Sequence, residues 1–304
     1  MGIRLSDLDA VLEAGRKKGP FTVVVAAGHD PAALEAVRLA EECGLARSLL
    51  VGDPGLIGPA IDALPSRLKQ AEIVDAADEA AAVKKAVELV RRKTGDVLLK
   101  GKTQTGTLMH AVLDREEGLR TGKLLSDCFL FEYEAPGGVR LLCITDGGIN
   151  LQPDLAAKRQ ILENAVALYR KIGHPRPRVA VLSAVESVLP GHGPSLDAAA
   201  LARMAHCGQI ADCEVEGPLS LDLAIWPEAV AKKGHVGDVA GRADILLCPD
   251  IVSANLLAKS TTYFAHRRLA HVIMGASAPV LIPSRSDTPE AKLFSIALGA
   301  LTVR

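Results

Sequence analysis

The sequence predicts an α/β protein with about two lobes, and three observations support this. At 304 residues, the chain is longer than one typical domain and long enough for two lobes of about 150 residues each. Hydrophobic residues make up 49% but aromatic residues only 3%, so Val, Leu, Ile and Ala must build the core, as in buried parallel sheets. Short apolar runs bounded by turn residues alternate with amphipathic stretches, which is typical of repeated strand-helix units.

The first strand-helix unit shows this pattern most clearly. Residues 23–27 form an apolar run, Gly28 begins a turn, and Asp30 precedes Pro31 as the N-cap of a helix that reaches about Cys43. By the same criteria, we expect strands at 48–51, 73–74, 97–100, 141–145, 179–183, 245–248 and 279–283, and helices at 78–92, 105–114, 154–172, 195–207, 253–267 and 288–301.

No linker of low complexity separates the two lobes. Helical periodicity lapses between residues 118 and 138, so we expect a crossover near residues 126–134. The last helix follows its strand so closely that the chain is expected to return to the first lobe. We therefore assign residues 1–128 and 285–304 to the first lobe and residues 129–284 to the second.

Charge and cysteine content argue against several classes of protein. Lys and Arg total 35 against 36 for Asp and Glu, and no basic tail indicates a nucleic-acid partner. No apolar run reaches the roughly 20 residues that span a bilayer. The six cysteines lack CxxC pairs and zinc-site spacing, so we expect reduced, mostly buried thiols, no metal site and a cytoplasmic location.

The loop after the strand at 279–283 is the first candidate site. It contains Ser284, Arg285 and Asp287, and Thr288 and Pro289 then mark the start of a helix. A helix N-terminus offers unpaired backbone N–H groups and a positive dipole end, and the Arg285 guanidinium matches phosphate in a bidentate manner. The alternative is an ordinary exposed turn in which Arg285 and Asp287 pair with each other.

A second loop, residues 100–105, has the chemistry of a phosphate-binding loop. Gly101 permits close approach of a ligand, Lys100 supplies a positive charge, and Thr103 and Thr105 supply hydroxyl groups. The spacing of a nucleoside-triphosphate-binding loop is missing, which argues against a nucleotide triphosphatase. The alternative is a capped turn with exposed lysines.

Two further groups of polar residues follow buried strands. Asp146 and Asn150 lie after the strand at 141–145, and Asn255 and Lys259 lie four residues apart on the helix after the strand at 245–248. Polar groups at the carboxyl ends of strands often line a ligand crevice. The alternative for Asp146 and Asn150 is an Asx turn that Asn150 caps.

Motifs of other enzyme classes are missing. The chain has no Gly-x-Gly-x-x-Gly fingerprint for a nicotinamide dinucleotide and no Gly-x-Ser-x-Gly elbow for a serine hydrolase.

Taken in order, the segments resemble the phosphate acetyltransferase and phosphate butyryltransferase family, closer to its butyryl branch. The resemblance runs from Ala27 to Ala297. The stretches that carry it are 99–101, 144–146 with Asn150 and Pro153, 178–183 with Glu186, 208–210, 217–219 with Asp222, 241–246, Asn255 with Lys259, and 284–287.

The resemblance implies two three-layer α/β/α lobes of the isocitrate/isopropylmalate dehydrogenase type, with an active-site cleft between them, and usually a homodimer. The reaction would be reversible transfer of a short-chain acyl group between coenzyme A (CoA) and inorganic phosphate, by direct attack in a ternary complex. CoA is then a substrate, and no cofactor or metal is needed.

The resemblance also assigns roles to residues. Ser284, Arg285 and Asp287 would be catalytic: the first two would bind phosphate and the reacting carbonyl, and Asp287, or alternatively Glu290, would deprotonate the CoA thiol. The expected substrate-binding residues are Lys100, Thr103, Thr105, Asp146, Asn150, Asn255 and Lys259.

Two positions depart from the butyryl branch. Asp127 stands where a histidine is frequent, and His110 stands where an arginine is frequent on the helix after the Lys100 loop. Three alternatives stay open: a phosphate acetyltransferase, a metal- and NAD-dependent hydroxyacid dehydrogenase of the same fold, and a catalytically silent CoA-binding protein.

Overall fold

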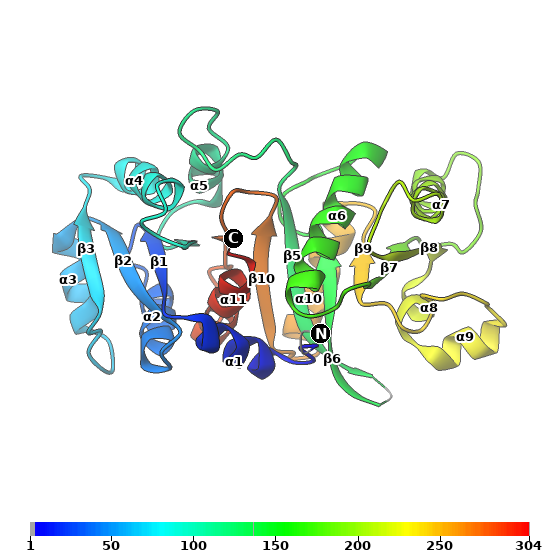
Figure 1. The fold of residues 1–304 in the computed structure, drawn as a ribbon, viewed down its shortest axis with the longest axis horizontal. Coiled ribbons are helices and arrows are strands. Elements are labelled where there is room, and N and C mark those ends of the chain that lie inside the picture. Colours follow the sequence, from blue (N-terminus) through cyan, green and yellow to red (C-terminus); the bar gives the residue numbers. More distant parts are fainter. Residues whose placement is uncertain (1–3, 136, 304) are drawn as a thin grey trace. The chain divides into compact units, whose positions relative to one another are not determined.

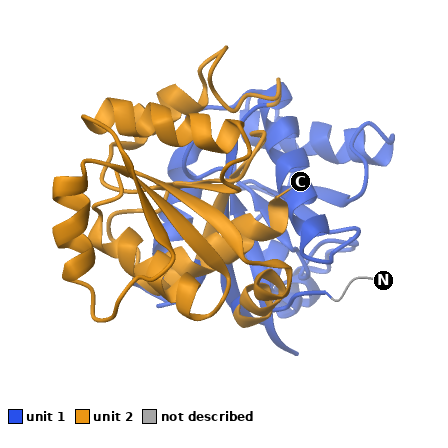
Figure 2. Cartoon of the chain, turned by 60° about the vertical axis from the view of Figure 1, so that its left-hand side comes forward, with its two compact units in different colours: residues 1–8, 124–269 blue, residues 9–123, 270–304 orange. Residues whose placement is uncertain are grey.

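The computed structural model describes residues 4–135 and 137–303 (Figure 1). The chain divides into two compact units, which Figure 2 shows in blue and orange. Unit 1 comprises the chain up to Leu8 together with Leu124–Leu269, and unit 2 comprises Asp9–Lys123 together with the chain from Ala270 onward. Both units are therefore discontinuous in sequence. The sequence analysis placed its boundaries at residues 128/129 and 284/285.

Unit 2 contains a mostly parallel sheet. Its strand order is β3 (Ala71–Asp75), β2 (Ala46–Gly52), β1 (Phe21–Ala26), β4 (Val97–Lys100), β11 (Val280–Leu281) and β10 (Leu269–Met274). The first five strands are parallel, and β10 pairs with β11 in the antiparallel direction. Because β11 pairs with β4, the chain has rejoined the sheet of unit 2 before it reaches Ser284.

The connections of this sheet place helices on both of its faces. Helices α2 (Pro31–Glu42) and α3 (Pro54–Asp62) lead from β1 to β2 to β3, whereas α4 (Glu79–Arg91) leads back to β4 on the other side of β1. Parallel crossovers are right-handed, so this reversal of direction puts α4 on the face opposite to α2 and α3. The result is a three-layer unit. Helices α5 (Thr105–Val112), α11 (Pro289–Thr302) and most of α1 (Leu8–Lys18) complete it, and α11 packs on α2.

Local sequence explains where these helices begin. Asp30, Asp53 and Asp78 each follow a strand, and each carboxylate accepts a hydrogen bond from a backbone N–H in the first turn of the next helix. Thr288 does the same for α11 by accepting from the Ala291 N–H at 3.1 Å. These caps fix the exits of the chain at the carboxyl ends of the strands.

Unit 1 is a second α/β unit (Figure 1). Its strand order is β5 (Ser126–Ala135), β6 (Gly138–Thr145), β9 (Ile245–Leu247), β7 (Arg178–Leu182) and β8 (Glu214–Leu219). β5 and β6 are antiparallel, and the other pairs are parallel. Its helices are α6 (Leu155–Lys171), α7 (Gly193–His206), α8 (Leu221–Ile225), α9 (Pro227–Lys233) and α10 (Ile251–Tyr263).

The predicted α/β class is confirmed, and every predicted strand and helix overlaps an observed element of the same kind. The chain passes from unit 2 to unit 1 at Lys123/Leu124, just before the crossover expected near residues 126–134, and those residues lie within strand β5. Leu130 and Phe131 are buried there, whereas Glu132 and Glu134 interrupt the apolar pattern that marked the other strands. The sequence analysis also missed α1, α3, α8, α9, β8 and β10.

The predicted state of the cysteines is confirmed. All six are free thiols, and Cys128, Cys143, Cys213 and Cys248 are buried. Over residues 4–135 and 137–303, no helix combines the length and apolar character that crossing a bilayer requires.

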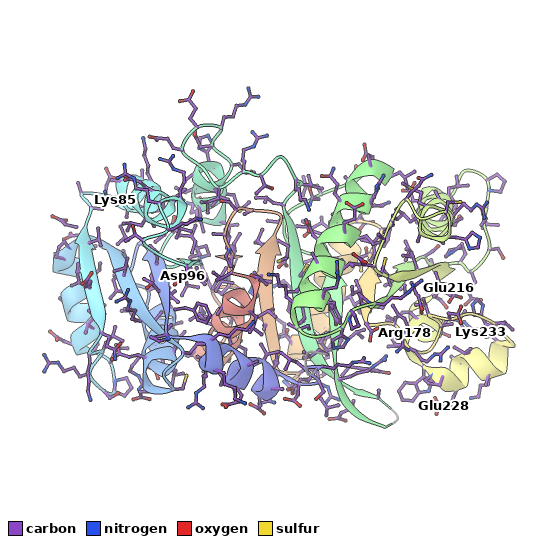
Figure 3. All side chains as sticks on the ribbon, viewed as in Figure 1. Lys85, Asp96, Arg178, Glu216, Glu228 and Lys233 are labelled. Carbon is purple, nitrogen blue, oxygen red and sulfur yellow. The ribbon has the colours of Figure 1, made fainter. Side chains whose placement is uncertain are left out.

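We predict that Asp96 stabilises unit 2 by joining β1 to β4. Its Oδ2 accepts the Thr22 N–H at 2.7 Å, and its own N–H donates to the Thr22 carbonyl at 2.8 Å (Asp96 is labelled in Figure 3). Replacing Asp96 with Ala leaves the Thr22 N–H unpaired, which should cost about 1–3 kcal/mol of unfolding free energy. Urea unfolding measures this loss. Asp96→Asn keeps an acceptor and should recover most of it; equal losses in the two variants would contradict the assigned bond.

Candidate active site

Unit 2 contains a pocket of about 560 Å³ at the carboxyl ends of its parallel strands. It is lined by Ala27, His29, Asp30, Gly52, Asp53, Leu56, Ala77, Asp78, Glu79, Ala82, Arg285 and residues 100–104. β1 and β4 are neighbours whose connections leave toward opposite sides, and ligands bind at such switch points in open α/β sheets. The loop at residues 100–105 and the loop at Ser284, predicted separately, therefore meet at one pocket.

Gly101 allows the loop after β4 to lie close to the loop after β1. A Cβ atom on Gly101 would lie 2.4 Å from the Ala27 carbonyl oxygen, which is inside van der Waals contact. The loops after β1 and β4 can pack this closely only because no side chain stands between them.

Lys100 supplies a buried positive charge to the pocket. Only 6% of the residue is exposed, and its Nζ donates to the carbonyl oxygens of Thr103 at 3.2 Å and Gly101 at 3.4 Å. Burial lowers the pKa of Lys100, and this effect together with the charges of Arg285 and Lys292 outweighs the opposing charges of Asp30 and Asp287. An anion in the pocket would oppose this lowering and favour the charged ammonium.

The two threonines of the same loop differ in their surroundings. Thr103 is buried, and its hydroxyl donates to Glu79 Oε1 at 2.6 Å, so this side chain ties the loop to the start of α4. Thr105 is exposed at the first position of α5 and does not line the pocket. The Thr103 hydroxyl is therefore held by Glu79, and Thr105 lies outside the pocket lining.

The loop from Ser284 to Asp287 does not form the ordinary turn considered as its alternative. Asp287 does not pair with Arg285: its Oδ2 accepts the Ser284 N–H at 2.7 Å and lies 3.4 Å from His271 Nε2. Arg285 is exposed, and its guanidinium has no carboxylate partner in the part of the chain that the structure describes. The Ser284 hydroxyl lies 3.0 Å from the Ser286 hydroxyl. Arg285 is therefore free to bind an anion.

Two residues beneath this loop were missed by the sequence analysis. His271 lies on β10 with 9% of its surface exposed, and Lys292 lies on α11 with 3% exposed. The Lys292 ammonium donates to the Asp287 carbonyl at 2.7 Å and the Ser284 carbonyl at 3.4 Å. One signal could have revealed them: each is an isolated titratable residue in an otherwise apolar segment, a position where burial requires a partner.

The surroundings of Asp287 favour its ionised form. Burial by itself would raise the pKa of Asp287. The hydrogen bond and charge of His271, the Ser284 N–H and the charge of Lys292 together outweigh that effect and hold the pKa below its usual value.

In unit 1, two of the predicted substrate-binding residues, Asp146 and Asn150, lie in one hydrogen-bonded loop, and a third, Asn255 on α10, bonds to it. Asp146 is 4% exposed, and its carboxylate accepts the N–H groups of Gly148 at 2.9 Å, Ile149 at 3.0 Å and Asn150 at 3.1 Å. The Asn150 amide donates to Asp146 Oδ2 at 2.5 Å, and the Asn255 amide donates to the Gly147 carbonyl at 2.9 Å. These side chains hold the loop at residues 146–150 in one conformation.

Asp127, one of the two departures from the butyryl branch, lies beside this loop. Its N–H donates to Asp146 Oδ1 at 3.2 Å, and the residue is 8% exposed. Burial raises the pKa of Asp146, the charge of Asp127 raises it further, and the hydrogen bonds from the loop only partly oppose this. Lys259 is exposed on α10, with its Nζ 5.9 Å from the centre of the Tyr263 ring. His110, the other departure, is exposed on α5.

The dehydrogenase alternative required clustered aspartates or histidines. Within the described ranges, no group of three or more His, Cys, Asp or Glu residues could hold a metal ion.

The chain is similar in sequence to known acyltransferases. The family model described as phosphate acetyl/butaryl transferase matches residues 79–300. A probable phosphate butyryltransferase of Bacillus subtilis is 43% identical over 297 residues, covering 98% of this chain and 97% of that protein. A phosphate acetyltransferase of Rhizobium meliloti is 40% identical over 296 residues, covering 97% of this chain and 93% of that protein.

A solved structure gives the same result. The crystal structure of a branched-chain phosphotransacylase from Enterococcus faecalis V583 superimposes with a TM-score of 0.80 at 34% identity, covering 93% of this chain and 100% of that one. With a family model matching most of its length and relatives above 30% identity over nearly all of it, the chain belongs to the phosphate acetyl/butaryl transferase family of acyltransferases.

Proposed function

We propose that this phosphate acyltransferase moves a short-chain acyl group, butyryl or a similar group, reversibly between CoA and inorganic phosphate. The observation that carries the proposal is the pocket of unit 2, where the Lys100 loop and Arg285 meet in a chain of this family. An acyl chain longer than acetyl is favoured because relatives named phosphate butyryltransferase are 42–43% identical, against 40% for a phosphate acetyltransferase, and because a structural neighbour is a branched-chain phosphotransacylase. We propose CoA as a substrate and no further cofactor or metal.

We assign phosphate binding to Arg285 and Ser284. The Arg285 guanidinium has no carboxylate partner among the described residues, and it can take two phosphate oxygens at once. Ser284 precedes the N-terminus of α11, where the helix dipole favours an anion. The same donors would stabilise the oxyanion that forms when the acyl carbonyl is attacked.

We assign a second anionic group of the substrates to Lys100. Its ammonium is buried beside the pocket and, among residues 4–135 and 137–303, donates to backbone carbonyls and pairs with no carboxylate. Thr103 and Thr105 would act through the backbone of their loop. Asp146, Asn150 and Asn255 would likewise act through the loop that they hold, and Lys259 would contribute an exposed ammonium.

Direct transfer between the two substrates is favoured over an acyl-enzyme on cysteine. Burial raises the pKa of Cys248 to about 12, and Cys143 is fully buried. A thiol nucleophile must ionise, and the burial of Cys248 opposes this. Proximity of two bound reactants would then supply much of the rate enhancement.

The test of the proposed function is thiol release from a panel of acyl-CoAs, from acetyl to branched five-carbon chains, in the presence of phosphate. We expect butyryl-CoA or a branched relative to exceed acetyl-CoA in kcat/KM by about tenfold or more, since each methylene in an apolar site contributes to discrimination. Highest activity with acetyl-CoA would favour the phosphate acetyltransferase alternative, and binding without turnover would favour a silent CoA-binding protein. Exchange of CoA into acyl-CoA without phosphate would contradict direct transfer.

Arg285→Ala should lower kcat/KM by about 10²–10³, because the variant loses a charged donor to the phosphate and the oxyanion. Arg285→Lys retains the charge without the bidentate fork and should recover only part of the activity. Circular dichroism and the unfolding midpoint serve as controls, since the exposed Arg285 side chain makes no ion pair that the fold would lose. Near-normal activity of Arg285→Ala would contradict its role.

We also propose a homodimer in the cytoplasm. The six free thiols support a reducing compartment. Helix α10 supports the assembly, because it exposes large apolar side chains: Val252 is 63% exposed, Leu256 64% and Tyr263 51%. Exposed apolar patches of this kind commonly mark contacts between proteins.

Replacing Val252 and Leu256 together with Glu should convert the dimer to a monomer, because charges would be buried at the contact without partners. Size-exclusion chromatography with light scattering measures the mass. Val236→Glu, a matched change at a position that is 94% exposed and outside α10, should leave the dimer intact. A monomeric wild-type protein would contradict the proposal.

A further inference from the structure

Three titratable side chains, those of His271, Asp287 and Lys292, converge beneath the Ser284–Arg285 loop. The Asp287 carboxylate accepts the Ser284 N–H at 2.7 Å and lies 3.4 Å from His271 Nε2. The Lys292 ammonium donates to the backbone carbonyls of Asp287 at 2.7 Å and Ser284 at 3.4 Å. The side chains of His271 and Asp287 are only 11% and 12% exposed. Every one of these contacts acts on the backbone of the loop or on Asp287 itself.

The partners of Asp287 are themselves fixed by neighbouring elements. The His271 N–H on β10 donates to the Ser295 hydroxyl at 3.0 Å, and that hydroxyl donates to the Ala291 carbonyl at 2.8 Å. Both Ser295 and Lys292 belong to α11. β10 and α11 are therefore joined by hydrogen bonds, and both contact the loop at Asp287, α11 through the Lys292 ammonium and β10 through the 3.4 Å contact of His271 Nε2.

This arrangement makes Asp287 a poor proton acceptor. Its pKa lies below the usual value, while an unperturbed thiol has a pKa of about 8.5. Proton transfer from the thiol to Asp287 would then be strongly uphill, because the carboxyl group is a much stronger acid than the thiol. A general base is most effective when its pKa is near the working pH. The Oδ2 atom of Asp287 also already accepts the Ser284 N–H and contacts His271 Nε2.

The reaction does not require the protein to take up a proton. When CoA attacks an acyl phosphate, the S–C bond forms and the C–O bond to phosphate breaks. The thiol loses one proton and the departing phosphate gains one, so the products are the thioester and hydrogen phosphate. In the reverse direction, hydrogen phosphate attacks the thioester and its proton goes to the departing sulfur. A phosphate oxygen held by Arg285 can thus exchange this proton directly.

We propose that Asp287, held by His271 and Lys292, is a positioning residue that fixes the loop carrying the Ser284 hydroxyl and Arg285 for phosphate, and that the thiol proton passes to the phosphate. This inference rests on the proposed phosphate acyltransferase function. It assigns His271 and Lys292 to the same task.

Two substitutions of Asp287 separate positioning from general base catalysis. Asp287→Asn keeps the shape and an oxygen acceptor for the Ser284 N–H but has no basicity, whereas Asp287→Ala removes both. We expect kcat of Asp287→Asn to fall by less than about tenfold, and Asp287→Ala to raise the KM for phosphate by about tenfold or more, because the Ser284 N–H loses its partner. If Asp287 were the base, both variants would lose about 10²–10⁴ in kcat, with little change in the KM for phosphate. That result, or two variants with normal kinetics, would overturn the proposal.

His271 and Lys292 give a second test that does not depend on the Asp287 variants folding. His271→Ala and Lys292→Met should each raise the KM for phosphate more than they lower kcat, and His271→Gln, which keeps a donor toward Asp287, should restore most of the affinity. A fall in the unfolding midpoint with unchanged KM and kcat would show a purely structural role and overturn the proposal.

Asp154→Asn is the matched control. Asp154 is also a carboxylate that accepts a backbone N–H at the start of a helix, α6 of unit 1, and it has no part in the assigned set. Its kinetics should match the wild type. A wild-type protein inactive on every acyl-CoA would sink the proposed function, whereas an active wild type with a base-like Asp287→Asn would sink this inference alone.

Discussion

The candidate site depends on the strand order of unit 2. The chain first adds β2 and β3 on one side of β1 and then returns to place β4, parallel to β1, on the other side. The connections after β1 and β4 pack closely at Ala27 and Gly101 and then run toward opposite edges of the sheet of unit 2. The capping aspartates after β1, β2 and β3 then fix where each helix leaves. Arg285 reaches the same edge because β11 is parallel to β4. The strand order therefore creates the pocket, and particular side chains make the pocket selective for anions.

Local electrostatics supply that selectivity in a chain that is nearly neutral overall. The formal net charge is −1, so no long-range field draws anions to the protein. Besides its burial, the positive charges of Arg285 and Lys292 lower the pKa of Lys100, and the negative charges of Asp30 and Asp287 raise it. Lys100 and Lys292 are both buried, and burial lowers the pKa of each. An anion bound in the pocket would offset the cost of keeping the Lys100 ammonium charged, which ties binding to the charge state of the site.

Sequence reasoning predicted the loops well because each follows a short apolar strand, and strand ends are marked by Gly, Pro and Asp. It predicted Lys100 and Arg285 separately, but their meeting depends on strand order, which no local pattern encodes. β5 and β10 were missed because charged or titratable residues interrupt their apolar runs. His271 and Lys292 were missed for a related reason: each lies in a segment that otherwise predicts core, so its contact with the loop is visible only in three dimensions. Thr103 shows the opposite case, in which a sequence pattern suggests more than the structure supports. It matches a ligand-binding pattern, yet its hydroxyl donates to Glu79.

Asp146 and Asp287 show how partners decide what a carboxylate does. Each follows a strand and accepts backbone N–H groups of its own loop. Asp146 lies beside a second carboxylate, Asp127, and its pKa is raised, whereas Asp287 lies beside His271 and Lys292, and its pKa is lowered. The same local motif thus gives two different charge environments. A carboxylate next to a phosphate-binding arginine therefore need not be a general base. Such a carboxylate can instead accept hydrogen bonds from the loop that carries the arginine, and it then holds that loop rigid. A rigid loop needs less reorganisation when phosphate binds and the acyl group is transferred.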